Sequence, residues 1–100
     1  MPITSTKHQF NESNIDTYAP DGPGVYGLYE SIFTPIYIGS SEENIKSRLK
    51  SHLSGAEGKC TKEAEYFNTE LHDNPKQREK ELLEEHNKVC GKLPKCNDVL

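Results

Sequence analysis

The sequence lacks the long apolar segments that mark membrane and secreted proteins. Its longest strongly apolar candidate, residues 35–39, is only strand-sized. Crossing a bilayer requires about eighteen consecutive apolar residues or more. Residues 1–7 contain no apolar stretch of the kind found in a signal peptide. The chain is therefore expected to be cytoplasmic and to have no membrane partner.

Cysteine is also scarce, with three residues and no CxxC pair. An odd number of cysteines excludes a complete disulfide framework, so the sequence predicts reduced thiols, as in most intracellular proteins. His86, Cys90 and Cys96 do not show the four donors in paired short spacings that a structural zinc site needs. A zinc site is not expected.

The chain has no excess of positive charge. Lys and Arg number 12 against 16 Asp and Glu, which gives a formal net charge of −4. This excludes a protein that grips nucleic acid by bulk charge alone, and any phosphate binding must be local. The basic residues do cluster within residues 46–50, 76–80 and 88–95. These clusters fit solvated helix faces as well as they fit a nucleic-acid contact.

With 100 residues, the chain has the length of one small domain. Residues 1–23 are polar and turn-rich and are expected to form an irregular N-terminal arm. Residues 24–29 and 36–38 are rich in β-branched and aromatic residues on either side of a short turn, which predicts an antiparallel hairpin. A third strand is expected around residues 64–69.

Two helices are expected around these strands. Ser40 or Ser41 is a candidate N-cap for the first, which ends near Gly55 and carries apolar residues at positions 45, 49 and 53. The second begins at Asn74 and Pro75 and ends near residue 90, where Gly91 follows. The predicted fold class is α/β (α+β), with a small three-stranded antiparallel sheet flanked by helices.

Helical spacing selects the residues that can act together. Arg48 and His52 lie one turn apart on the same flank of the first helix, so both can reach one ligand. On the second helix, the buried arc is expected to contain residues 82, 83, 89 and 90. Glu85 lies at the border of this arc and Glu84 points away, so Glu85 is the better candidate for an inward-facing carboxylate.

An arginine, a histidine, tyrosines and one carboxylate are the side chains that a metal-assisted phosphodiesterase needs. Mg²⁺ is often bound by only one or two carboxylates together with water and substrate phosphate. Arginine binds the phosphate through two donors, and a tyrosine or histidine relays the proton of the attacking water. Taken alone, this set has low specificity, because most small domains contain such residues.

The order of the motifs is much more specific, and it resembles the GIY-YIG nuclease family. The matching segments are Gly24-Val25-Tyr26, Tyr37-Ile38-Gly39, residues 45–49 with Arg48, His52, Glu85, and residues 93–97 with Asn97. The resemblance extends over residues 24–97 and implies a nuclease domain at residues 24–100, similar to the catalytic module of UvrC-type excision nucleases. It also implies the three-stranded sheet expected from the residues themselves.

The resemblance implies a role for each residue near the scissile phosphate. Tyr26 would activate or position the attacking water, with Tyr37 beside it. His52 would accept the proton from Tyr26, and Arg48 would stabilise the pentacovalent phosphate.

The remaining assignments concern the metal and the support of the site. Glu85 would hold a single divalent cation, Mg²⁺ or Mn²⁺, and Asn97 would support the site. Tyr29 occupies a variable position and is expected to pack behind it. Val25 in place of isoleucine, and a segment at residues 41–44 that is one residue longer than usual, are the departures from the family pattern.

The implied function is a divalent-metal-dependent endonuclease that hydrolyses phosphodiester bonds in DNA, including branched or nicked DNA, with RNA left open. A repair or mobile-element setting and a partner protein that supplies specificity are typical of the family. The alternative is a catalytically silent module of the same fold that binds nucleic acid or a protein partner. The acidic charge and the lack of an appended DNA-binding domain favour this alternative.

Overall fold

Four antiparallel strands and four helices make up residues 3–97, the part of the chain that this computed structural model describes. The strands are β1 (His8–Gln9), β2 (Gly24–Ser31), β3 (Thr34–Ser41) and β4 (Tyr66–Leu71), and the helices are α1 (Glu12–Tyr18), α2 (Ile45–Ser54), α3 (Lys59–Lys62) and α4 (Pro75–Cys90). The strand order is β1-β4-β2-β3, so β2 is central and β3 lies at an edge. The α+β class is confirmed. The prediction of three strands was wrong, because the two-residue β1 adds a fourth beside β4.

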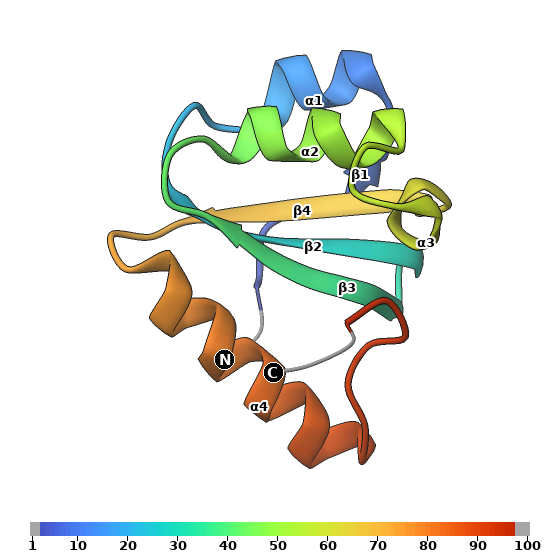
Figure 1. Ribbon diagram of the computed structural model, residues 1–100, viewed down its shortest axis with the longest axis vertical. Coiled ribbons are helices and arrows are strands. Elements are labelled where there is room, and N and C mark those ends of the chain that lie inside the picture. The colour runs from blue at the N-terminus through green and yellow to red at the C-terminus, as the bar shows by residue number, and fades with distance from the viewer. Residues whose placement is uncertain (1–2, 98–100) are drawn as a thin grey trace.

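The sheet carries a separate apolar core on each face. Figure 1 shows α1 and α2 on one face and α4 on the other. The α1/α2 face buries the larger cluster: Phe10, Ile15, Ala19, Tyr26, Leu28, Ile36, Ile45, Leu49, Ala64 and Phe67. The α4 face buries Ile3, Val25, Ile38, Leu82 and Leu83. Alternate residues of β2 therefore face different helices, as the two-residue period of a strand requires.

The predicted hairpin is confirmed as β2 and β3, which pair antiparallel with Tyr26 opposite Gly39. The first predicted helix is α2, but Ser40 and Ser41 belong to β3 and do not cap it. Asn44 is the N-cap, and its side chain accepts a hydrogen bond from the backbone N–H of Ser47. Within the longer segment at residues 41–44, Ser41 ends β3, and residues 42–44 connect it to α2.

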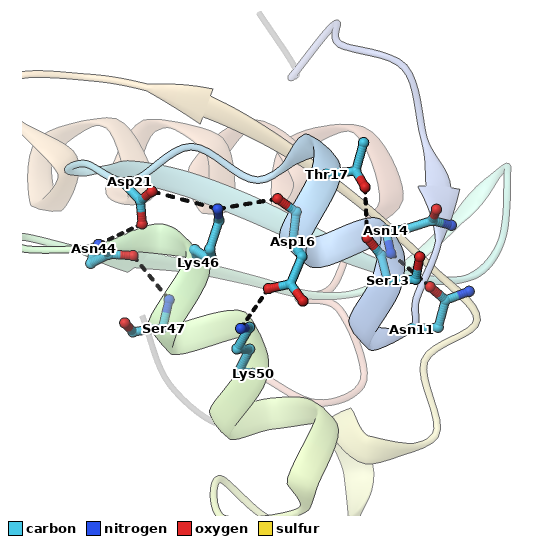
Figure 2. A network of polar contacts seen from close by, with 10 residues as sticks. All are labelled: Asn11, Ser13, Asn14, Asp16, Thr17, Asp21, Asn44, Lys46, Ser47 and Lys50. Carbon is cyan, nitrogen blue, oxygen red and sulfur yellow. Dashed lines mark hydrogen bonds and ion pairs between the residues drawn. The ribbon is translucent and has the colours of Figure 1, made fainter.

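Residues 1–23 were expected to form an irregular arm, and this expectation was wrong for residues 8–18. Asn11 caps α1, and Ile15 of α1 is fully buried in the larger core. Polar contacts join α1 and the following turn to α2 (Figure 2): Lys50 pairs with Asp16, and Lys46 donates a hydrogen bond to the Asp16 carbonyl at 3.2 Å. The arm is thus part of the fold and fixes α2 on the sheet.

The segment after α4 runs back along the free edge of β3. Gly91 ends α4 in the left-handed conformation, with φ 78°. The backbone N–H of Cys96 donates to the carbonyl of Ile36 at 2.7 Å. Asn97 then makes two hydrogen bonds to the backbone of Ile38, at 2.9 and 3.0 Å. None of the helices in the described part of the chain has the length and apolar character that crossing a membrane requires.

The same segment carries a disulfide bond between Cys96 and Cys60 of α3. The expectation of reduced thiols was therefore wrong for these two residues, and it holds for the exposed Cys90. No local pattern marks this pair, because its members are 36 residues apart and come together where the C-terminal segment returns along β3.

Removing this bond should lower stability substantially. For a sequence separation of 36 residues, loss of the cross-link from the unfolded chain is expected to reduce the free energy of unfolding by about 4 kcal/mol. Cys60→Ser should show this loss in urea denaturation without reductant, and Cys90→Ser, which changes an exposed unpaired cysteine, should stay within about 0.5 kcal/mol of the parent. Equal stability of the parent and Cys60→Ser would contradict the disulfide.

Candidate active site

The centre of the candidate site is a buried hydrogen bond between a strand and a helix. Tyr26 lies on the central strand β2 and is fully buried, with its ring toward α2. Its hydroxyl oxygen lies 2.7 Å from Nε2 of His52, which is 2% exposed. The two rings meet edge to face, with centroids 5.5 Å apart. A phenol and an imidazole in direct contact are suited to pass a proton between them.

Gly39 makes room for the phenol. It lies opposite Tyr26 in the β2–β3 ladder, and a Cβ at this position would lie 2.6 Å from both Cζ and the hydroxyl oxygen of Tyr26. Any side chain here would displace the phenol from His52. The glycine of the Tyr37-Ile38-Gly39 motif therefore has a steric role in the site.

His52 is held at both of its ring nitrogens. Besides the contact of Nε2 with Tyr26, its Nδ1 lies 2.8 Å from the hydroxyl oxygen of Thr61. Burial lowers the pKa of His52 to about 4, and the nearby Glu57 carboxylate opposes this shift. The ring is therefore neutral near pH 7, so one nitrogen can accept a proton.

Tyr37 of β3 lies beside this pair. Its ring centroid is 6.2 Å from that of Tyr26 and 5.1 Å from that of His52. Burial raises the pKa of both tyrosines, and the negative charges of Glu57 and Glu79 raise the two pKa values further. Both hydroxyls therefore keep their protons at neutral pH.

Arg48 lies on α2, one turn before His52, as its spacing predicted. Its nearest acidic partner is Glu57, with Nη1 and Oε1 3.9 Å apart at the limit of an ion pair. The guanidinium opens onto a cleft of about 510 Å³ between the end of β3 and the start of α4. The cleft is lined by Ser40, Ser41, Glu42, Glu43, Asn44, Ser47, Arg48, Ser51 and Lys76. The hydroxyls, the amide and the two cations can bind phosphate, and Glu42 and Glu43 add two carboxylates to the same cleft.

The other basic residues near the cleft are bound to acids of the protein. Lys46 and Lys50 lie on the α1 side of α2, where they contact Asp21 and Asp16 (Figure 2). Arg78 forms a two-pronged pair with Glu70 of β4 at 2.7 and 3.2 Å. Arg48 and Lys76 are therefore the cations that line the cleft itself.

Glu79 is a carboxylate near the tyrosines that the sequence reasoning missed, and Glu57 is another whose charge acts on both of them. Glu79 lies on α4, and its Oε1 accepts a hydrogen bond from the hydroxyl of Ser40, the residue that follows Gly39. Its negative charge acts on both Tyr26 and Tyr37. It is partly buried, one turn from Lys76 of the cleft.

The structure does not bring Glu85 to this cluster. Glu85 lines a different, mostly apolar hollow of about 400 Å³, together with Tyr29, Leu82 and Val89. Glu85 is partly buried and Glu84 is exposed, as the helical wheel predicted, whereas Val89 and Cys90 were expected to be buried and are exposed. The buried line of α4 runs through Pro75 and Leu83, and Glu79 lies four residues from each. This spacing was present in the sequence and could have identified Glu79.

The oxygen ligand offered by Glu79 fits a hard divalent cation that takes only one or two of its ligands from the protein. In the described part of the chain, no cluster of three or more His, Cys, Asp or Glu side chains forms a metal cage. Mg²⁺ is commonly bound by one or two carboxylates, with water and substrate phosphate completing its shell. A single carboxylate beside a hydroxyl and a phosphate-binding cleft matches this mode.

Asn97 contacts the backbone of the strand that carries Tyr37 and Gly39. Its side-chain amide binds both polar atoms of the Ile38 backbone, between Tyr37 and Gly39. Tyr29 lies further away, and its hydroxyl donates to Asn68 at 2.8 Å. Thr61 is the other residue that the sequence reasoning missed, and no motif or periodicity marks its short helix.

Residues 22–93 match the family model of the GIY-YIG catalytic domain. The match covers most of the chain, including both tyrosine motifs and the helices α2 and α4. The chain belongs to the GIY-YIG family, and such a domain indicates nuclease-type activity. Comparison with curated proteins gives no match.

The low pKa of His52 predicts a loss of stability in acid. Below its ordinary pKa of 6.5, this histidine binds a proton in the unfolded chain, whereas burial holds the folded pKa at about 4. The folded state therefore loses up to about 3 kcal/mol relative to the unfolded state as the pH falls from 6.5 to 4.

Urea denaturation at several pH values measures this effect. His52→Gln should remove that part of the pH dependence, and His72→Gln, at a position outside the cluster, should keep it. The same slope in the parent and in His52→Gln would contradict a buried neutral His52.

Proposed function

We propose that the protein is a divalent-metal-dependent endonuclease that hydrolyses phosphodiester bonds in DNA. The observation that carries this proposal is the buried Tyr26–His52 hydrogen bond, with Arg48 one helical turn before His52 and lining the cleft. The membership of the GIY-YIG family supports it. DNA is the proposed substrate because the cleft presents a local set of phosphate-binding groups on an otherwise acidic chain.

Tyr26 is the proposed proton acceptor for the attacking water. Because its pKa is raised by burial, a free tyrosinate is unfavourable, and the phenol must lose its own proton as it gains the proton of the water. His52 is in contact to receive that proton at Nε2. The resulting imidazolium is balanced by the charge of Glu57, which favours protonation of this ring.

Arg48 has the proposed role of stabilising charge on the phosphate. Its forked guanidinium can bind two phosphate oxygens, and the interaction strengthens as negative charge develops in the transition state. Lys76, on the opposite side of the cleft, is placed to bind a neighbouring phosphate. Tyr37 is proposed to orient Tyr26 and His52 by ring packing.

Glu79 would hold the cation, in place of Glu85. When bound, a divalent cation supplies charge that offsets the negative phosphate and the leaving oxygen. The Ser40 hydroxyl orients the Glu79 carboxylate through their hydrogen bond. Asn97 is proposed to fix the strand between Tyr37 and Gly39.

A second candidate is a module that binds nucleic acid or a protein without cleaving it. Its support is the net charge of −4 and the pairing of Lys46 and Lys50 with acids of the α1 side. For this second function, the affinity for nucleic acid or a protein partner should depend on Arg48 and should not change on replacement of Glu79 or addition of chelator.

Plasmid nicking separates these functions. The parent should convert supercoiled DNA to open circles in Mg²⁺ or Mn²⁺ and stop on addition of chelator. Tyr26→Phe and Glu79→Gln should each lower the rate by about 100-fold or more, the scale of a lost acid–base or charge contribution.

Glu85→Gln is the matched control on the same helix and should cleave at the parental rate. Equal nicking by all four proteins would assign the activity to a contaminant. Binding without nicking, with or without metal, would overturn the proposal in favour of the binding module.

A further inference from the structure

Thr61 lies on the short helix α3 and contacts His52 of the Tyr26–His52 pair. Its hydroxyl oxygen lies 2.8 Å from Nδ1 of His52, on the side of the ring opposite Tyr26, and the residue is 4% exposed. His52 thus lies between two hydroxyl groups, one from β2 and one from α3. Each hydroxyl can donate or accept, so these contacts are compatible with either neutral tautomer of the ring.

The proposed chemistry requires one of the two neutral tautomers. His52 can accept the Tyr26 proton at Nε2 only if its own proton is on Nδ1. In that tautomer, Nδ1–H donates to Thr61. In the other tautomer, Nε2–H would donate to Tyr26, and no lone pair would face the phenol.

A hydroxyl behind the ring differs from the carboxylate that orients many catalytic histidines. A carboxylate at Nδ1 would favour the imidazolium and raise the basicity of the resting ring. The threonine oxygen accepts a hydrogen bond from Nδ1–H in both the neutral and the protonated ring, without adding charge. It therefore keeps the orientation of His52 constant while the proton arrives.

The position of Thr61 is fixed by its neighbours. It follows Cys60, whose disulfide to Cys96 ties the four-residue α3 to the segment that runs along β3. Thr61 precedes Ala64, which is buried in the core that also contains Tyr26. Such a short helix would otherwise be held by few contacts, and the covalent link keeps its hydroxyl at the ring.

We propose that Thr61 is a positioning residue that accepts the Nδ1 proton of His52 and so keeps Nε2 available to Tyr26. The effect of Thr61 on catalysis rests on the proposed endonuclease function. The tautomer of His52 is a property of the protein without substrate or metal, so it can be measured independently of any nicking assay.

Nitrogen-15 NMR of the full chain with labelled histidine measures this tautomer at pH 7. The parent is expected to show a protonated Nδ1 and an unprotonated Nε2 on His52. Thr61→Val, which replaces the hydroxyl by a methyl of similar size, should move the population toward Nε2–H, and Thr61→Ser should restore the parental pattern. Thr17→Val, an exposed threonine on α1, is the matched control.

Nicking kinetics supply the second readout. Thr61→Val should lower kcat by roughly 10- to 100-fold, the scale for a group that orients a catalytic histidine, with KM unchanged and with most of kcat regained in Thr61→Ser. A parental His52 that carries its proton on Nε2 would overturn the role, and this holds even if Thr61→Val fails to fold. An unchanged tautomer in a folded Thr61→Val protein would overturn it as well. Absence of nicking by the parent, together with the expected tautomers, would count against the endonuclease function alone.

Discussion

The hydrogen bond between Tyr26 and His52 is the contact on which the rest of the site depends. It joins the central strand to the helix that packs on it, inside the larger of the two cores. Three features serve this contact: the missing side chain at Gly39, the burial of Ile45 and Leu49 that fixes α2, and the contact of Thr61 at the far side of the ring. Because the pair is buried, both rings stay neutral at rest, and proton movement has to be coupled between them.

The edge strand β3 divides the site between the two faces of the sheet. The proton-transfer residues lie on the α1/α2 face, and Glu79 approaches from α4 on the other face. The cleft with Arg48 and Lys76 opens where the two faces meet at the end of β3. A small protein can hold groups of such different polarity because the neutral Tyr26–His52 pair is buried in one core, whereas the Glu79 carboxylate lies on the other face of the sheet. The N-terminal segment contributes indirectly, because Asp16 of α1 and Asp21 of the turn after it pair with Lys50 and Lys46 of α2 (Figure 2).

The sequence predicted the parts of the site that are local in the chain. The hairpin, the α2 face and the i, i+4 relation of Arg48 and His52 follow from strand and helix periods, and the structure agrees with them. Glu79 was within reach of the same reasoning, because it lies four residues from both Pro75 and Leu83, the buried residues of α4. The prediction that Val89 and Cys90 are buried was wrong. Amphipathic spacing fails at a helix end that projects beyond the sheet.

Other features depended on contacts that no local pattern encodes. Thr61 and the Cys60–Cys96 bond arise where α3 meets the returning C-terminal segment, and helix α1 has Ile15 as its buried residue in a polar sequence. The β1 strand exists only because β4 offers it a partner. Such features are determined by tertiary packing and not by propensity.

The most direct test of the central claim is where a divalent cation binds. Titration of nitrogen-15-labelled protein with Mn²⁺ broadens the amide signals nearest the bound ion. A cation held by Glu79 predicts early loss of the signals of Ser40, Glu79 and their neighbours, and no such loss in Glu79→Gln. Early loss around Glu85 and Val89, or an equal response in Glu79→Gln, would contradict it.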